Sequence, residues 1–352
     1  MESRTLTAQE AEAFGRELDA LRREIVGDLG QRDVDHIRGV VRLAYRSEAA
    51  GRLLLALGFE PLSFVAGVGA LALGKILENM EIGHNVIHGQ YDWTRDPTLD
   101  SRTYEWDLAC AAEDWRHAHN FEHHTFTNIL GKDRDVGYVF LRVYPEQPWR
   151  PRHLAQPLVA LGLALFFEWG IAMHDLHLAE LLDGDERLAN VGRRARPFLT
   201  KAAWQIVKDY VFHPALAWWN APRVLAGNLL ANLVRNVWAF GINFCGHFPD
   251  GTRVYSEAEA RQESRGQWYV RQVNGSANLD GGRWFHVLSG HLSHQIEHHL
   301  FPDLPAARYP EMAPRVRALC ARYGQRYGTG RFFRQFGSVA RRLVVLALPS
   351  RA

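Results

Sequence analysis

The most chemically informative feature of the sequence is the way its histidines cluster. Of 17 histidines in 352 residues, six lie within residues 84–124 and five within residues 286–299, far more than an even spread would place there. Neutral imidazole is the commonest metal ligand among protein side chains. The clustering therefore predicts a metal centre assembled from two distant parts of the chain.

Three short motifs, HNVIH, HNFEHH and HQIEHH, give these histidines a helical spacing. In the first motif His84 and His88 are four residues apart. His119 and His123 repeat that spacing in the second motif, and residues four apart share one face of an α-helix, where they can converge on one ion. The second histidine of an HH pair points about 100° away, so a pair can reach two ions or bind one ion from the side. The pattern favours a dinuclear site.

Other classes of histidine-rich protein fit less well. A single HxxxH pair would carry little weight, because isolated histidines are mostly surface or hydrogen-bonded residues, but three motifs in one chain reverse that judgement. A zinc peptidase of the HExxH type needs Glu directly after the first histidine, and Asn85 and Asn120 stand there instead. A membrane metal transporter or sensor is a non-enzyme alternative, but it would need histidines spread along spanning segments.

Apolar segments must position these motifs. Residues 62–80 are almost wholly apolar up to Lys75 and lead directly into His84, with a length that suits one membrane crossing. Further candidates are more polar or shorter, and the weakest of them carries Lys208 and Asp209. These candidates are residues 153–176, residues 223–246 and, most weakly, residues 202–219.

The fold class that follows is an all-α integral membrane protein. We expect a helical bundle of about four spans, each of roughly 20 residues, with a cytosolic helical cap that holds the metal site. Polar stretches at 91–150 and 250–352 would form the cap and explain a mean hydropathy of only −0.24. We expect a single domain over 1–352, with an amphipathic helical region at 1–45 and a surface tail at 331–352.

Membrane topology constrains the motifs further. They must share one membrane face, so an even number of crossings should separate His124 from His247. Residues 153–176 and 223–246 would supply two crossings, which leaves the role of 202–219 open. That arrangement would place four basic residues on the far side, against the positive-inside tendency. They are Arg193, Arg194, Arg196 and Lys201.

Charge and cysteine content narrow the setting. The net charge of +2, without a long basic run, gives no reason to expect a nucleic acid partner. Cys110, Cys245 and Cys320 are too far apart for a CxxC metal site and indicate a reduced, cytosol-facing protein. The charged first residues lack the apolar core of a signal peptide, so membrane insertion should rely on internal segments.

Four stretches resemble the membrane fatty acid desaturase family, and most closely its bacterial acyl-CoA desaturases of the mycobacterial stearoyl-CoA type. The resemblance runs from about residue 45 to residue 330 and leaves out the first helix and the tail. The four stretches are ENMEIGHNVIHGQYDW (78–93), WRHAHNFEHHTFTNILGKDRDVGY (115–138), NFCGHFPDG (243–251) and HQIEHHLFPDLP (294–305).

The resemblance implies two iron ions as cofactor and O2 as co-substrate. Asn243 matches a position that holds a metal-bound water. In the third motif Gln295 stands where many relatives have a ligand histidine, and the resemblance favours it, although by spacing alone His294 is an equal candidate. The implied histidine ligands, which are also the catalytic residues, are His84, His88, His119, His123, His124, His247, His298 and His299.

The implied activity is an O2-dependent desaturation of a long-chain fatty acyl-CoA, with Δ9 favoured, at the cytosolic face of a bacterial inner membrane. No HPGG cytochrome b5 signature or nucleotide site is seen, so electrons should come from an external NADPH-dependent flavin or ferredoxin-type reductase. Alternatives within the class are a front-end Δ5 or Δ6 desaturase, an acyl-lipid substrate, and a lipid hydroxylase or acetylenase. Five tryptophans would either line an acyl tunnel or pack in the core: Trp93, Trp106, Trp115, Trp238 and Trp284.

Overall fold

The computed structural model describes residues 3–349 apart from 175, 178–180 and 182–187. Helices dominate these residues, as predicted. The described part of the chain also holds one small parallel sheet, in which β1 (Asn278–Asp280) pairs with β2 (Thr329–Arg331).

A first helical hairpin carries the HNVIH motif. It consists of α2 (Gln31–Leu57) and α3 (Pro61–Ile76), and α3 continues through the π-helical turn η1 (Leu77–Gly83) into α4 (His84–Ile87). The two helices approach closely at Gly51, where an added Cβ would lie 2.6 Å from a backbone nitrogen of α3. Small residues at such crossings let helix backbones pack tightly.

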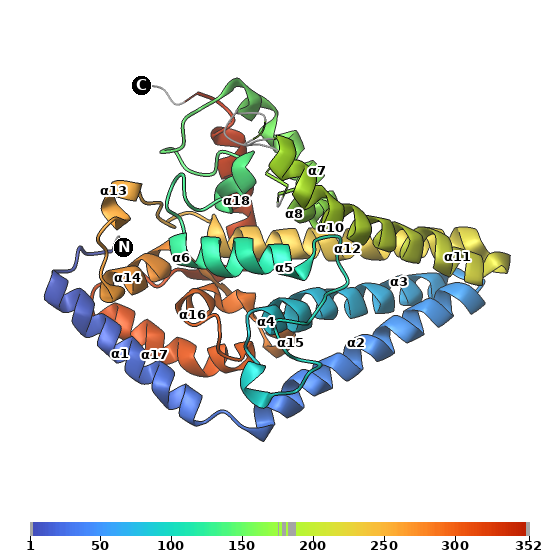
Figure 1. Cartoon of the computed structure of the whole chain (residues 1–352), viewed down its shortest axis with the longest axis horizontal. Coiled ribbons are helices and arrows are strands. Elements are labelled where there is room, and N and C mark those ends of the chain that lie inside the picture. The colour runs from blue at the N-terminus through green and yellow to red at the C-terminus, as the bar shows by residue number, and fades with distance from the viewer. Residues whose placement is uncertain (1–2, 175, 178–180, 182–187, 350–352) are drawn as a thin grey trace.

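A second hairpin brings His247 to the same end of the bundle. It begins with α10 (Leu188–Ile206), passes through the π-helical turn η6 (Val207–Phe212) and α11 (His213–Leu216), and returns as α12 (Ala221–His247). In Figure 1 α12 runs beside α3, and the turns of both hairpins lie at the right-hand tip of the molecule. The weak segment 202–219 is therefore the partner of 223–246.

Residues 153–176 do not form one straight helix. They contain η5 (Pro151–Ala155), α7 (Gln156–Leu165) and α8 (Phe167–His174), and the chain bends by 105° where Phe166 leaves the helical conformation. The segment stays a candidate crossing, bent and not straight, because hydropathy reports apolar character and not direction.

One helix among the described residues, Pro61–Ile87, is long and apolar enough to cross a membrane, and the bent pair adds a second if it counts as one span. The helical character of the predicted fold is confirmed, while a bundle of about four spans stays a prediction. Large apolar side chains are nevertheless exposed along both hairpins, especially near their turns. They include Leu53, Leu57, Phe59, Leu62, Val65, Val211, Phe212, Leu216, Trp218 and Trp219.

The first and last helices of the chain pack on helices between them. Helix α1 (Ala8–Gly27) starts with the Thr7–Glu10 capping box and lies against α14 (Arg265–Gly275) and α17 (Tyr309–Arg322). Helix α18 (Phe332–Val345) packs on α12. The remaining elements are η2 (Asp92–Thr94), α5 (Ala112–Trp115), η3 (Arg116–His123), α6 (His124–Phe126), η4 (Val136–Val139), η7 (Trp218–Asn220), α13 (Glu257–Ala260), α15 (Arg283–Leu288), η8 (Leu292–His294), α16 (Gln295–Leu300) and η9 (Ala306–Arg308).

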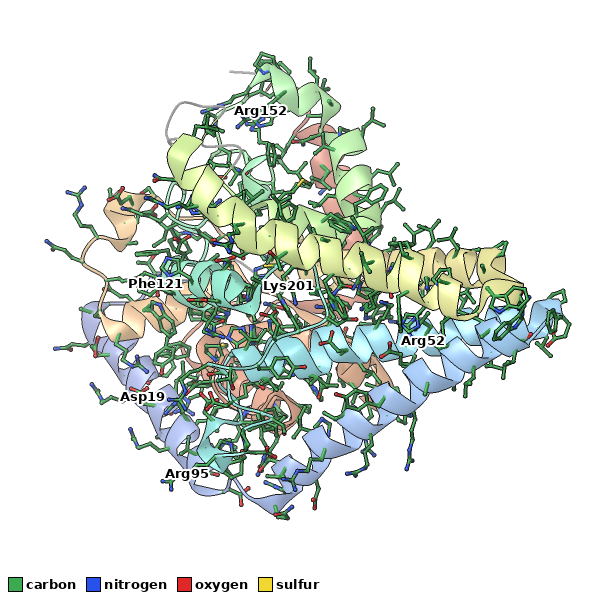
Figure 2. All side chains as sticks on the ribbon, turned by 45° about the vertical axis from the view of Figure 1, so that its right-hand side comes forward. Asp19, Arg52, Arg95, Phe121, Arg152 and Lys201 are labelled. Atoms are coloured by element: carbon green, nitrogen blue, oxygen red, sulfur yellow. The ribbon has the colours of Figure 1, made fainter. Side chains whose placement is uncertain are left out.

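A buried ionic cluster joins the two hairpins. Asp209 of η6 accepts a hydrogen bond from Lys75 of α3 at 2.8 Å and one from Arg52 of α2 at 3.3 Å. The side chains of Asp209 and Lys75 are only 2% and 5% exposed. Arg52, labelled in Figure 2, lies where the hairpins face each other. Polar residues that weaken 202–219 as an apolar segment are thus paired inside the bundle.

We predict that Asp209→Ala destabilises the protein by about 3–5 kcal/mol, because it leaves buried cations without their partner. Asp35→Ala is the matched control, since Asp35 is exposed and, within the described part of the chain, accepts a hydrogen bond only from Gln31. Unfolding of the purified protein in detergent measures both. Equal unfolding midpoints for the two variants would contradict the prediction.

Candidate metal centre

The structure brings the three histidine motifs and His247 together at the ends of α4 and α12, beside η3 and α16. The first motif arrives on the extension of α3, the second on η3 and α6, the third on α16, and His247 stands at the end of α12. All eight predicted histidines are buried: His84, His88, His119, His123, His124, His247, His298 and His299.

Seven of these histidines form two groups. Within each group, one ring nitrogen of every histidine lies within 4.8 Å of those of the others. The first group contains His84, His88, His119 and His298. The second group contains His123, His247 and His299.

His124 lies between the two groups. Its ring centroid is 4.9 Å from that of His88, 4.8 Å from that of His298 and 4.7 Å from that of His299. Both of its ring nitrogens are buried and have no hydrogen-bond partner. His124 can therefore face either group.

The histidines four apart lie together in both motifs, but in different ways. His84 and His88 share a group, as positions four apart on an α-helix should. The His119 and His123 rings stack, with centroids 4.9 Å apart, and lie together with Asp135, although His119 stands in the first group and His123 in the second. Residues four apart in the π-helical η3 therefore still share a face, and this motif borders both groups.

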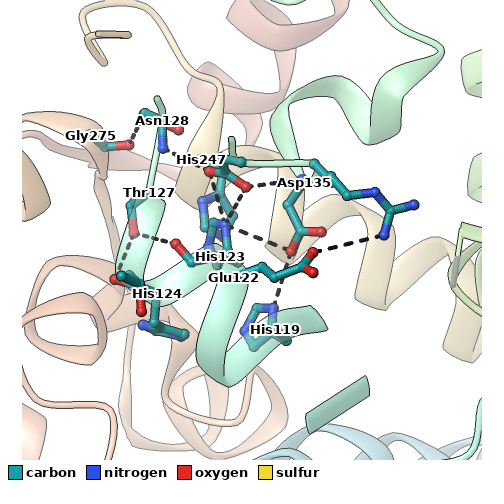
Figure 3. Close-up of polar contacts among 12 residues, drawn as sticks. His119, Glu122, His123, His124, Thr127, Asn128, Asp135, His247 and Gly275 are labelled. Carbon is teal, nitrogen blue, oxygen red and sulfur yellow. Dashed lines mark hydrogen bonds and ion pairs between the residues drawn. The ribbon is translucent and has the colours of Figure 1, made fainter. Parts of the chain in front are cut away.

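Outer hydrogen bonds orient the rings. Asp135 accepts from Nδ1 of His119 at 3.1 Å, and Asp133 accepts from Nδ1 of His123 at 3.0 Å. Figure 3 shows Asp135 beside both rings. Nδ1 of His299 lies 3.1 Å from the Gln272 side-chain oxygen. Carboxylate and amide acceptors at the far nitrogen are the usual outer partners of metal-binding histidines.

The opposite nitrogens point inward and lack partners. Buried polar atoms are normally hydrogen-bonded, so a set of unpaired nitrogens facing one another is the donor arrangement of a cation site. The donor set therefore fits two transition-metal ions of the kind the resemblance implies. The buried Nε2 atoms without a hydrogen bond belong to His88, His119, His123, His124, His298 and His299.

Protonation states agree with this arrangement. Burial lowers the pKa of His124, His298 and His299 well below the ordinary histidine value, so these rings are neutral and can bind a metal. Burial also lowers the pKa of His123, but the charges of Asp133 and Asp135 outweigh it and leave that pKa raised.

The third motif places Gln295 and His294 in different surroundings. The Gln295 amide nitrogen is 3.2 Å from Nε2 of His247, and the Gln295 side-chain oxygen is buried without a partner. The His294 ring lies instead 4.5 Å from that of His286. Helix α16 begins at Gln295, so the helical spacing that made His294 an equal candidate does not extend back to it.

Several other buried or partly buried histidines and acids have separate contacts. His36 and His291 both hydrogen-bond the buried Glu81, at 2.7 and 2.9 Å, and link α2 to the segment before α16. Glu297 bonds Asn278 and Tyr327 rather than a histidine, and burial raises its pKa to about 7.

A pocket adjoins the histidines on the side of α8 and α12. Two of the five tryptophans, Trp106 and Trp115, line it, whereas Trp93 and Trp284 are exposed and Trp238 packs on Phe332. Sequence patterns missed several lining residues, because nothing in their spacing marks them: Met80, Tyr138, Phe167, Ile171, Ala239 and Leu292. Asn243 and Gln295 line the same pocket.

The family model described as fatty acid desaturase matches residues 62–331. This chain belongs to the fatty acid desaturase family. The predicted resemblance is confirmed, and the protein is an oxidoreductase of the desaturase type.

Two relatives illustrate the range of the likeness. The chain is 43% identical over 350 residues to the NADPH-dependent stearoyl-CoA 9-desaturase of Mycobacterium tuberculosis, an alignment that covers 98% of this chain and 82% of the relative. It is 26% identical over 288 residues to the sn-1 linoleoyl-lipid 6-desaturase of Synechocystis, covering 76% of this chain and 77% of the relative.

We predict that His124→Ala and His299→Ala each lower bound iron and reduce turnover by at least roughly 10- to 100-fold, the loss that removal of an outer partner alone brings. His117→Ala is the control, because the His117 side chain is 70% exposed. Iron analysis and product formation test this. Full activity in either variant would remove that residue from the ligand set.

For the third motif we predict that Gln295→Ala lowers bound iron more than His294→Ala, since Gln295 contacts His247 and His294 does not. Iron per chain, measured after identical loading of both variants, decides the matter. A larger loss in His294→Ala would show that motif spacing is the better guide.

Proposed function

We propose that this protein is an O2-dependent acyl-CoA desaturase that introduces a cis double bond into a saturated long-chain acyl-CoA at the Δ9 position. The observation that carries the proposal is the pair of inward-facing histidine groups beside a largely apolar pocket. The name of the mycobacterial relative supports the acyl-CoA substrate and the Δ9 position.

The proposed reaction converts –CH2–CH2– to –CH=CH– while O2, two electrons and two protons become two water molecules. We propose that the first histidine group would hold one iron ion and the second group the other, with His124 and Gln295 as additional ligands and Asn243 acting through water. Two bound iron ions would supply the oxidising power for an unactivated methylene, which side chains alone lack.

The protein's own part is placement and exclusion of water. Met80, Trp115, Phe167 and Leu292 give the pocket an apolar wall against which an acyl chain can lie. Each buried methylene contributes about 0.8 kcal/mol, so a long acyl chain would be held mainly by the burial of its many methylene groups. Asp133 and Asp135 keep the His123 and His119 rings turned so that Nε2 faces inward.

A front-end desaturase is the second candidate. The QIEHH form of the third motif, with glutamine at 295, is typical of front-end enzymes, and the Synechocystis relative is named a 6-desaturase of a lipid-bound chain. The higher identity and fuller coverage of the stearoyl-CoA relative favour Δ9.

We further propose that both hairpins cross a bacterial inner membrane, giving about four spans with the metal centre on the cytosolic side. The chain then crosses the membrane twice between His124 and His247, once through α10–α11 and once through α12, and two is an even number. The basic start of α10 then lies on the cytosolic side, as the positive-inside tendency requires. Lys201, only 3.0 Å from Glu105, supports this, since Glu105 precedes the second motif.

We predict that a host without its own desaturase, given this chain, forms a new alkene at Δ9 of saturated acyl chains, which mass spectrometry locates. Purified protein with NADPH should turn over only after an NADPH-dependent reductase is added. Alkene only at Δ5 or Δ6 would favour the front-end alternative, whereas a hydroxylated product without alkene would contradict desaturation.

A further inference from the structure

One short segment supplies outer partners to three site residues. Within Asp133–Val139, Asp133 accepts from His123 and Asp135 accepts from His119. Three residues later the Tyr138 hydroxyl donates to the Asn243 side-chain oxygen at 3.1 Å. The first two contacts orient histidine rings, and the third has the same form but acts on an amide.

The backbone of this segment is strained where Tyr138 sits. Gly137, Tyr138 and Val139 have φ angles of 66°, 50° and 64°, three left-handed residues in succession. Only glycine adopts this region freely, and a β-branched residue such as Val139 rarely does. Strain of this kind persists where the surroundings fix the backbone, and it is concentrated at functional sites.

The ring of Tyr138 is fixed from several sides. It stacks on Phe244 with centroids 5.7 Å apart and planes within 13°, and meets Phe167 and His174 edge-on at 5.9 and 5.4 Å. Only 7% of the residue is exposed. The hydroxyl therefore has one well-defined position.

Asn243 is the one partly exposed member of this contact, and it faces the pocket. It lies one helical turn before His247, and both line the pocket together with Gln295. An asparagine amide can turn over and exchange its donor and acceptor ends unless a hydrogen bond fixes it. The hydroxyl of Tyr138 provides that bond.

We propose that Tyr138 is a positioning residue for the second histidine group: it holds the Asn243 side-chain oxygen, so that the amide keeps one orientation toward the pocket beside His247. This inference rests on the proposed function, since Asn243 has a role only if that group holds iron. Tyr138 touches neither the histidine nitrogens of that group nor, in this proposal, the iron.

Tyr138→Phe removes the hydroxyl and keeps the packed ring. We expect bound iron, thermal midpoint and KM to stay at wild-type values, kcat to fall by roughly 10- to 100-fold, and the Mössbauer spectrum of the iron-loaded protein to change. Asn243→Ala should give the same losses, and the double variant should add nothing further. Tyr323→Phe is the matched control, because it removes a hydroxyl that bonds Glu17 at the surface.

A wild-type kcat and spectrum in Tyr138→Phe would overturn the inference. Loss of iron or a lowered midpoint in Tyr138→Phe would also overturn it, by showing a role in folding instead. A wild-type protein that binds no iron and forms no alkene would overturn the proposed function itself, which the Tyr138→Phe result alone cannot do.

Discussion

The constraint on which the structure depends is the burial of eight histidine rings whose inward nitrogens face one another. Each unpaired buried polar atom costs about 1–3 kcal/mol. Without a cation, the six Nε2 atoms of this set would together cost about as much as the whole stability of a typical domain, about 5–15 kcal/mol. A bound cation would pair these nitrogens and turn that cost into stabilisation, while the surrounding contacts hold the rings in place.

Hydrogen bonds from neighbouring side chains hold these rings in place. Asp133 and Asp135 bind the far nitrogens of the second motif, and Gln272 binds that of His299. At a larger scale, Asp209 ties one hairpin to the other through Lys75. That pairing keeps the end of α3, with the first motif, beside the end of α12, with His247.

Much of the site could be predicted from the sequence, because histidine type and local spacing report ligand chemistry directly. Their division into two groups could not, since it depends on how distant segments of the chain are placed in space. His294 looked equal to Gln295 only while the helix was taken to include both. Residues 202–219 looked weak because they carry Lys208 and Asp209, and the pairing of Asp209 across the bundle cannot be seen in the sequence. The bend at Phe166 leaves no trace in hydropathy.

π-helical turns recur where the chemistry is concentrated. One turn, η1, leads into His84, a second, η3, contains His119 and His123, and a third, η6, contains Asp209. A π-helical turn holds an extra residue and is tolerated mainly where function requires it. In η3 that turn carries both His119 and His123: His119 stands in the first group and His123 in the second, while the two rings stack 4.9 Å apart and lie together with Asp135. One short motif can thus contribute to both groups, with Asp135 beside the two rings where the groups meet.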